Sequence, residues 1–337
     1  QAGFGKSGAR FIVSTIFAVN MIGWFGIQNG VCGEAFSNAM LAMTGWDIPV
    51  VVSNTIWGII MLLTAVYGVH ALEKLDKISI PLLMIIMCYG TFLAFKVYGT
   101  GNLNDEGTVQ SMSFMSGVAL SFNFTAVGTI TGPDYTRFQK SRKDTVKSVF
   151  YGVFPMGVIT LIMGIVLTKL SGQYDISMVL IEVGLPLLGI IALVISTWRT
   201  NSTNAYSAGL NIVMALKLKD NRRREATLIS GIVGIVLCDL GILGHIEGVL
   251  SLLSYVVCPV GGVILADYWV VGKGKAKNFR PQDGVNWAGV IAWALGAIIS
   301  YTLVKIEFVG IIIGFVIYLI AERFIPSASR DNAENIA

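Results

Sequence analysis

The chain of 337 residues is 54% hydrophobic and only 13% charged, with a mean hydropathy of +0.72. Soluble domains carry about 25% charged residues, so this composition excludes a water-soluble globule, a disordered chain and a disulfide scaffold. The formal net charge is a modest +4. An all-helical integral membrane protein is therefore expected, and the 38 glycines fit the close helix packing that lipid requires.

Apolar runs separated by charge clusters, turn residues or proline predict ten membrane-spanning helices. At about 20 apolar residues per span, these helices use nearly the whole chain, so residues 1–337 are predicted to form one membrane domain without a soluble head. The predicted spans are 12–43, 48–69, 78–98, 113–132, 146–169, 184–216, 227–243, 247–271, 286–304 and 306–325.

Basic residues are distributed unequally between alternate loops. Twenty of the 24 Lys and Arg residues lie on one side of the predicted spans, whereas the other side carries only Lys96, Lys169 and Lys305. Positive charge accumulates on the cytoplasmic side of membrane proteins, so both ends of this chain are predicted to be cytoplasmic. The same distribution explains the net charge, and nucleic-acid binding is not expected.

Three clusters of polar residues fall inside predicted spans, where a polar side chain that has no function is costly. In the first span, Trp24 and Gln28 are four residues apart and share one helical face. An indole can stack on a flat ring, and an amide can both donate and accept hydrogen bonds. Helix packing of Trp24 and a backbone hydrogen bond of Gln28 are the alternative interpretation of this pair.

The second cluster is S-F-N-F-T-A-V-G-T-I-T-G-P at residues 121–133, within the fourth predicted span. Its glycines, its proline and its alternating polar residues predict a broken helix. Broken membrane helices are tolerated beside protein or a water-filled cavity, and transporters bind substrates at such breaks. A simple packing kink is the alternative.

The third cluster is S-T-W-R-T-N-S-T-N at residues 196–204. Isolated Ser and Thr residues bond back to the preceding helical turn, but a nine-residue patch with an arginine is not explained in that way. A polar stripe covering about 100° of the helix is predicted, made of Ser196, Arg199, Thr200, Thr203 and Ser207.

Glu34 is an acid inside the first predicted span. It is either a proton carrier or a residue near the outer surface, and the sequence does not decide between the two. No metal-ligand cluster and no hydrolase motif is visible, so neither an enzyme nor a cofactor is expected.

Four blocks resemble the nucleobase:cation symporter-1 family, particularly its bacterial cytosine permease branch. They are G-W-F-G at 23–26, S-F-N-F-T-A-V-G-T-I-T-G-P-D-Y-T-R-F at 121–138, W-R-T-N-S-T-N-A-Y-S-A-G-L at 198–210 and P-V-G-G-V-I-L-A-D-Y at 259–268. The blocks occur in the family's order and at similar spacing, and the resemblance covers nearly the whole chain.

The resemblance implies the LeuT-type inverted-repeat transporter fold, with this chain matching helices three to twelve of the family. The chain is accordingly expected to be truncated at its N-terminus. Since the family's first helix supplies part of the substrate and cation sites, this segment alone is not expected to transport.

For individual residues, the resemblance implies that a flat nucleobase lies between Trp24 and Phe124. Ser196 and Thr200 match positions near a sodium ion, and Ser196 can also contact the base. The remaining substrate-binding residues implied are Gln28, Asn123 and Asn201.

Arg199 departs from the family, because sodium-coupled members resemble a Ser or Thr ligand at this position. A guanidinium stays protonated and can occupy the place of the cation, but it cannot carry the coupling proton. Proton coupling is therefore favoured, with Glu34 or a residue outside the chain as carrier. If Arg199 instead turns aside to pair with an acid, a sodium site near Thr200 remains.

The predicted function is cation-coupled import of a nucleobase, cytosine or a purine, by alternating access across the bacterial inner membrane. A channel would need a continuous polar lining over several spans, whereas the polarity here is concentrated in three patches. The alternative is an amino-acid or other small-solute symporter of the same LeuT-type architecture.

Overall fold

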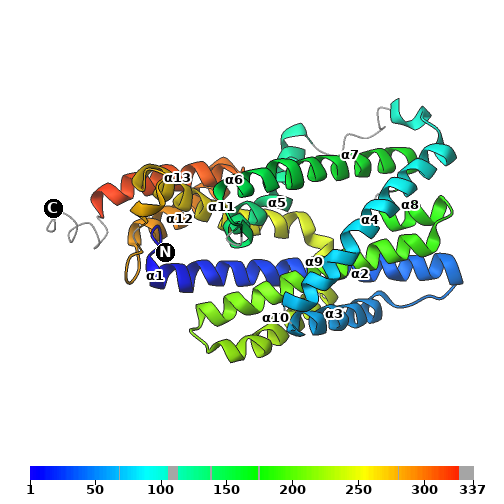
Figure 1. Cartoon of the computed structure of the whole chain (residues 1–337), viewed down its shortest axis with the longest axis horizontal. Coiled ribbons are helices and arrows are strands. Elements are labelled where there is room, and N and C mark those ends of the chain that lie inside the picture. Colours follow the sequence, from blue (N-terminus) through cyan, green and yellow to red (C-terminus); the bar gives the residue numbers. More distant parts are fainter. Residues whose placement is uncertain (68, 105–112, 137–138, 174, 280, 326–337) are drawn as a thin grey trace.

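The computed structural model describes residues 1–67, 69–104, 113–136, 139–173, 175–279 and 281–325 (Figure 1). Within these ranges all regular structure is helical, as the composition predicted. Short π-helical or 3-10 turns extend several helices, as at Ala9–Val13 before α2 and Ala266–Val271 after α11.

Each predicted span has a helix in the described part of the chain. The helices are α1 (Gly5–Gly8) leading into α2 (Ser14–Thr44), α3 (Val50–Tyr67), α4 (Val69–Tyr98), α5 (Phe114–Thr136), α6 (Arg142–Lys147) leading into α7 (Phe154–Ser171), α8 (Ile176–Glu182), α9 (Pro186–Ala215), α10 (Arg223–Asp239), α11 (Ile246–Leu265), α12 (Trp287–Ile299) and α13 (Val309–Phe324).

Six helical segments in the described ranges are long and apolar enough to cross a membrane by length and composition. They are Gly5–Thr44, Val50–Tyr67, Lys77–Tyr98, Arg142–Ser171, Ile242–Val271 and Trp287–Val304. Of the other predicted spans, α10 and α13 have only 17 and 16 residues. The 30-residue α9 contains the polar patch of residues 196–204 in its middle.

Three expectations about helix boundaries are wrong. The loop expected at residues 70–77 is helical, because its Leu, Glu and Lys residues favour a helix that continues beyond the apolar run. The short helix α8 was missed; its Asp175 accepts a hydrogen bond from Ser177 N, which is a typical N-cap. Finally, α5 is continuous rather than broken.

The continuity of α5 has a local explanation. The Thr125 hydroxyl bonds to the carbonyl oxygens of Ser121 and Phe122, so its polarity is satisfied within the helix. Gly128 and Gly132 do not adopt positive φ, and neither approaches a neighbouring element. A glycine pair alone therefore does not interrupt this helix.

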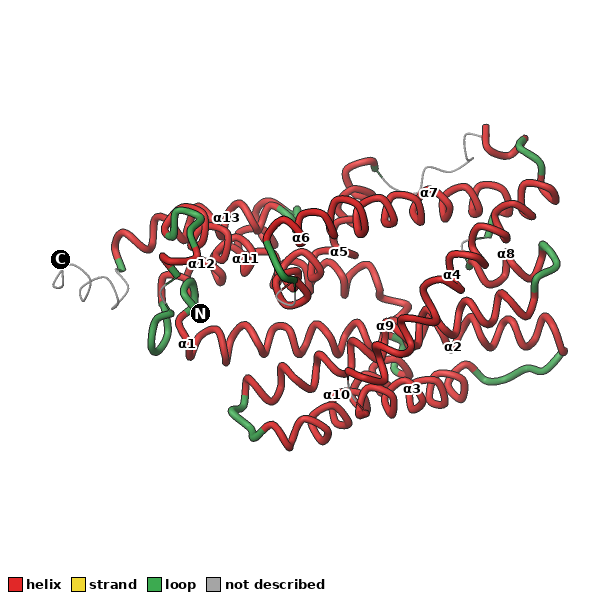
Figure 2. The backbone as a smooth tube through the Cα atoms, in the orientation of Figure 1, coloured by secondary structure: helices red, strands yellow, loops and turns green. Residues whose placement is uncertain are grey.

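Helices α2, α3, α9 and α10 pack together into one layer, which we call the scaffold layer (Figure 2). The most extensive helix pair is α2 with α9. Gly209 of α9 lies so close to α10 that a Cβ added there would be 2.1 Å from Thr227 Oγ1. The buried apolar core of this layer is formed by Phe25, Cys32, Met61, Leu62, Ala65, Ala205 and Ile235.

Helices α11, α12 and α13 form a second group, and the first eight residues dock on it. Phe4 is buried in the cluster that contains Tyr318, and Asn286 N donates to Phe4 O at 2.9 Å. Lys6 N donates to Gln282 O at 2.7 Å, and the Lys6 ammonium forms a salt bridge with Asp283. The start of the chain is thus fixed to residues about 280 positions later.

The start of α1 and the end of α13 lie at the same end of the molecule, near the N label in Figure 1. The turn between α9 and α10 lies there too, whereas the turn between α2 and α3 lies at the opposite end. We call the first of these the basic end, because the basic loops 1–10, 217–225 and 272–283 belong to it. A chain whose first and last helices begin and end on the same side crosses the membrane an even number of times, as predicted.

Candidate functional site

Trp24 and Phe124 form an aromatic pair between α2 and α5. Their ring centroids are 5.2 Å apart and their planes are at 89°, an edge-to-face contact. Trp24 is buried against Ile27 and Leu250, whereas the Phe124 side chain is 58% exposed. The structure therefore brings together the two rings that the sequence singled out.

This contact leaves no space for a base between the rings. A flat ligand stacked between two parallel rings needs the planes about 7 Å apart, twice the optimal carbon contact distance. Binding in the predicted manner thus requires one ring to turn and α5 to separate from α2.

Polar residues flank the aromatic pair on both helices. Gln28 is half-buried, one turn beyond Trp24 on the same face of α2. Asn123 precedes Phe124 and is buried, and its Oδ1 accepts no hydrogen bond from the residues that the structure describes. Asn20, one turn before Trp24, is also buried, and no prediction included it. The spacing of residues 20, 24 and 28 was the signal that could have found it.

The polar patch on α9 has two faces. Toward the scaffold layer, Asn201 is fully buried and its Nδ2 donates to Phe25 O at 3.1 Å. Ser202 donates to Met61 O, and Trp198 Nε1 donates to Thr64 Oγ1 at 2.8 Å. In this structure Asn201 therefore holds α9 against α2, and its amide does not face a cavity.

The other face of α9 carries the predicted cation residues Ser196, Arg199 and Thr200, all half-buried. Thr200 Oγ1 donates to Ser196 O at 3.0 Å, and Ser196 Oγ donates to Leu193 O at 3.0 Å. Each hydroxyl uses its proton in the helix and keeps lone pairs that can accept a proton donor or coordinate a cation.

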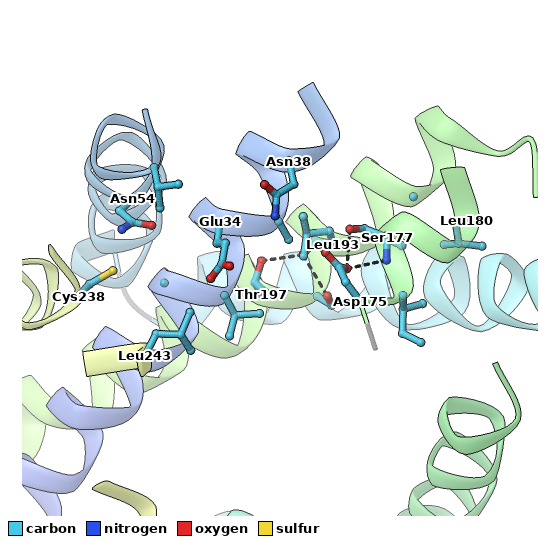
Figure 3. Close-up of a pocket in the computed structure, with 18 of the residues that line it drawn as sticks. Glu34, Asn38, Asn54, Asp175, Ser177, Leu180, Leu193, Thr197, Cys238 and Leu243 are labelled. Carbon is cyan, nitrogen blue, oxygen red and sulfur yellow. Dashed lines mark hydrogen bonds between the residues drawn. The ribbon is translucent and has the colours of Figure 1, made fainter. Parts of the chain in front are cut away.

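A cavity of about 1150 Å³ opens between the second half of α2 and the first half of α9. Figure 3 shows Glu34 of α2 reaching toward the stretch of α9 that carries Thr197, with Asp175 and Asn54 on the surrounding elements. Of the predicted residues, Glu34 and Ser196 line this cavity. Trp24, Phe124, Asn123, Arg199, Thr200 and Asn201 are not among the residues that line it.

Glu34 is exposed and lines this cavity, in the second half of α2. Asp239 of α10 also lines the cavity and accepts hydrogen bonds from Asn54 Nδ2 and Thr55 Oγ1, both at 3.4 Å. Asp239 was not among the predicted site residues. Its partners on α3 are distant in sequence, and no local pattern could have identified them.

Comparison with known proteins gives a family for the chain. Residues 1–322 match a family profile described as permease for cytosine/purines, uracil, thiamine, allantoin. The cytosine permease of Escherichia coli (strain K12) is 31% identical over 317 residues, which cover 92% of this chain and 72% of that protein. The allantoin permease of Bacillus subtilis (strain 168) is 25% identical over 383 residues, with coverages of 98% and 77%.

Solved structures with a similar fold include Mhp1, a nucleobase-cation-symport-1 family transporter. In its closed conformation with bromovinylhydantoin bound, Mhp1 matches with a TM-score of 0.73 at 20% identity, covering 96% of this chain and 77% of that chain. Its inward-facing conformation matches with a TM-score of 0.72 at 21% identity. These likenesses confirm the predicted all-α transporter fold. Together with the profile and the cytosine permease relative, they lead to one conclusion: the chain belongs to the nucleobase:cation symporter-1 family, a family of permeases and not of enzymes.

Proposed function

We propose that the protein imports a nucleobase, with cytosine as the first candidate, across the cytoplasmic membrane by cation-coupled alternating access. The observation that carries the proposal is the contact between Trp24 and Phe124, which joins the helices of two of the four family blocks. Cytosine is the first candidate because the Escherichia coli relative at 31% identity is a cytosine permease.

The aromatic pair supports a cycle with a closed and an open state. In the closed state the rings contact edge to face, as in this structure. In the bound state they lie on either side of the base, which replaces the ring contact with two stacking contacts. A ligand that binds only the separated arrangement shifts the population toward it, and this coupling is what alternating access requires.

The coupling ion in this proposal is a proton rather than sodium. Arg199 lies on the same stripe of α9 as Ser196 and Thr200, and in this proposal its permanent positive charge takes the place of a sodium ion. Glu34, exposed to the cavity, is the proposed proton carrier within this chain.

The test is uptake of radiolabelled cytosine into proteoliposomes of the full-length protein, with a sodium gradient or a proton gradient imposed separately. Uptake driven by the proton gradient and unaffected by sodium supports both parts of the proposal. Sodium-driven uptake rejects the interpretation of Arg199 and keeps the nucleobase. If no cytosine enters under either gradient, or if unlabelled cytosine, adenine, hypoxanthine and uracil all fail to reduce the uptake that is seen, the nucleobase function itself is rejected.

A further inference from the structure

Asn20 of α2 is a fully buried amide without a hydrogen-bonding partner. Its exposed fraction is 0%, and within the described part of the chain neither its Nδ2 nor its Oδ1 makes a hydrogen bond. The other buried asparagines of the scaffold layer, Asn29, Asn54 and Asn201, each donate at least one hydrogen bond through Nδ2. Asn20 thus stands apart from residues that serve helix packing.

Asn20 lies one helical turn before Trp24 on the same side of α2. At 100° per residue, Asn20 and Gln28 lie about 40° to either side of Trp24 on α2, so the three residues form one stripe along the helix. Trp24 contacts Phe124, and Asn123, next to Phe124 on α5, has a buried Oδ1 that also lacks a partner among the described residues. Unsatisfied amide groups therefore occur on both helices that carry the rings.

A buried amide with neither group satisfied is unfavourable, because the cost of removing it from water is not offset by a hydrogen bond. Such a residue persists in a packed helix pair where another state of the molecule supplies the partner. The rings must separate to admit a base, and a base beside Trp24 would lie one helical turn from Asn20 on the same stripe of α2.

We propose that Asn20 is a specificity-determining residue that pairs with a donor and an adjacent acceptor on one edge of a planar heterocycle. A carboxamide presents an N–H donor and a C=O acceptor side by side, and it is complementary to a ring edge that presents the same two groups in reverse. Trp24 and Phe124 stack on the two faces of the ring, and Asn20 forms hydrogen bonds with one edge. The inference rests on the proposed function, since it needs a base at the aromatic pair.

Asn20 and the two aromatic rings have different roles in binding. Stacking tolerates any flat ring, whereas a site built to hydrogen-bond an edge rejects ligands in which that edge is blocked, because buried polar groups are then left unpaired. Removing Asn20 should therefore change which ligands bind more than whether a flat ring binds.

The test measures equilibrium binding of three probes to the purified full-length protein: cytosine, 1-methylcytosine, which lacks the N–H beside the C2 carbonyl, and N4,N4-dimethylcytosine, which lacks the exocyclic donor beside N3. We expect one of the two derivatives to bind wild type about tenfold or more weakly than cytosine. In Asn20→Leu, cytosine binding should weaken by about tenfold, and that derivative should bind as well as cytosine does, because the discriminating amide is gone.

Asn29→Ala is the matched control, since Asn29 is a buried asparagine of the same helix about 140° away from the direction of Trp24. It removes the hydrogen bond to Asn54 O and should lower thermal stability without changing the ranking of the three probes. Asn20→Leu should keep the wild-type melting temperature, because it removes an unsatisfied group. Asn20→Ala provides a second variant if leucine prevents folding.

Three other results would overturn the inference about Asn20 or the proposed function. If Asn20→Leu binds cytosine like wild type, or keeps the wild-type preference among the three probes, the inference about Asn20 is overturned and the nucleobase function stands. Equal binding of all three probes to wild type also overturns it. If wild type binds none of the probes, the proposed function fails first.

Discussion

The indole of Trp24 is the largest side chain at the contact of α2 with α5, and it touches α11 as well through Leu250. In the proposed function it supplies one stacking face, and stacking of a base on an aromatic ring is worth about 1–3 kcal/mol. Trp24→Ala should therefore weaken cytosine binding by at least about tenfold, and Trp24→Phe should recover part of the affinity. Calorimetric titration measures this, with Trp46→Ala as the control because Trp46 is 70% exposed in the loop after α2. Equal affinities for Trp24→Ala and wild type would reject the stacking role.

Asn201, in contrast to Trp24, is expected to affect stability rather than the preference among bases. Its amide satisfies Phe25 O inside the scaffold layer, so Asn201→Ala leaves a buried carbonyl without its donor, at a cost of about 1–3 kcal/mol. The expected result is a lower melting temperature with an unchanged preference among bases. Thr203→Ala is the control, because the Thr203 hydroxyl only bonds back to Arg199 O within the helix. A change in base preference in Asn201→Ala would restore the contact with substrate that the resemblance implied.

These residues also show what the sequence could and could not predict about the site. Trp24 and Phe124 were found from the blocks that contain them, and their contact agrees with that choice. The resemblance implied that Asn201, in the polar patch of α9, contacts substrate. Which side of that patch packs on α2 is decided by contacts with Phe25 and Met61, about 140 or more positions away in the sequence. Local periodicity does not contain that information.

At the scale of elements, Gly209 and Gly128 differ in whether a neighbouring helix leaves room for a side chain. Gly209 is required where α9 meets α10, since an added Cβ would lie 2.1 Å from Thr227 Oγ1 and 2.7 Å from Thr227 Cα. Gly128 of α5 has no neighbouring element within 4 Å of such a Cβ. Gly209→Ala should therefore destabilise the protein by forcing α9 and α10 apart. Gly128→Ala should stabilise it by up to about 1 kcal/mol, because alanine is the better helix former.

Thermal unfolding of the two variants in detergent tests this prediction and, with it, the continuity of α5. If Gly128→Ala lowers the melting temperature as much as Gly209→Ala does, then α5 needs a glycine at residue 128, as a broken helix would. The sequence predicted such a break from Gly and Pro. It could not show that both glycines keep helical dihedral angles and that the hydroxyl of Thr125 is satisfied inside the helix.

At the scale of the whole molecule, each of the ten predicted spans has a helix in the described part of the chain, in the same order, because long apolar runs are a strong signal. The short helix α8 has no predicted counterpart. The expected orientation places the basic end in the cytoplasm. Single cysteines at Trp46 and Lys219 test this, since the two residues lie in turns at opposite ends of the molecule. In intact cells, a membrane-impermeant maleimide should label Trp46→Cys and should label Lys219→Cys only after permeabilisation. The reverse pattern would invert the topology, and the parent chain with its four native cysteines gives the background.

The docking of the first eight residues also bears on how the protein is made. Phe4, Lys6 and Ser7 find their partners at residues 282–286, so during synthesis these partners emerge only after most of the chain has entered the membrane. The helix α2, in contrast, packs on α3, α9 and α10, all of which precede residue 282. Residues 4–7 are therefore fixed in place later than the helix that follows them, and a ribosome that stalls before residue 282 leaves these residues without their hydrogen-bonding partners.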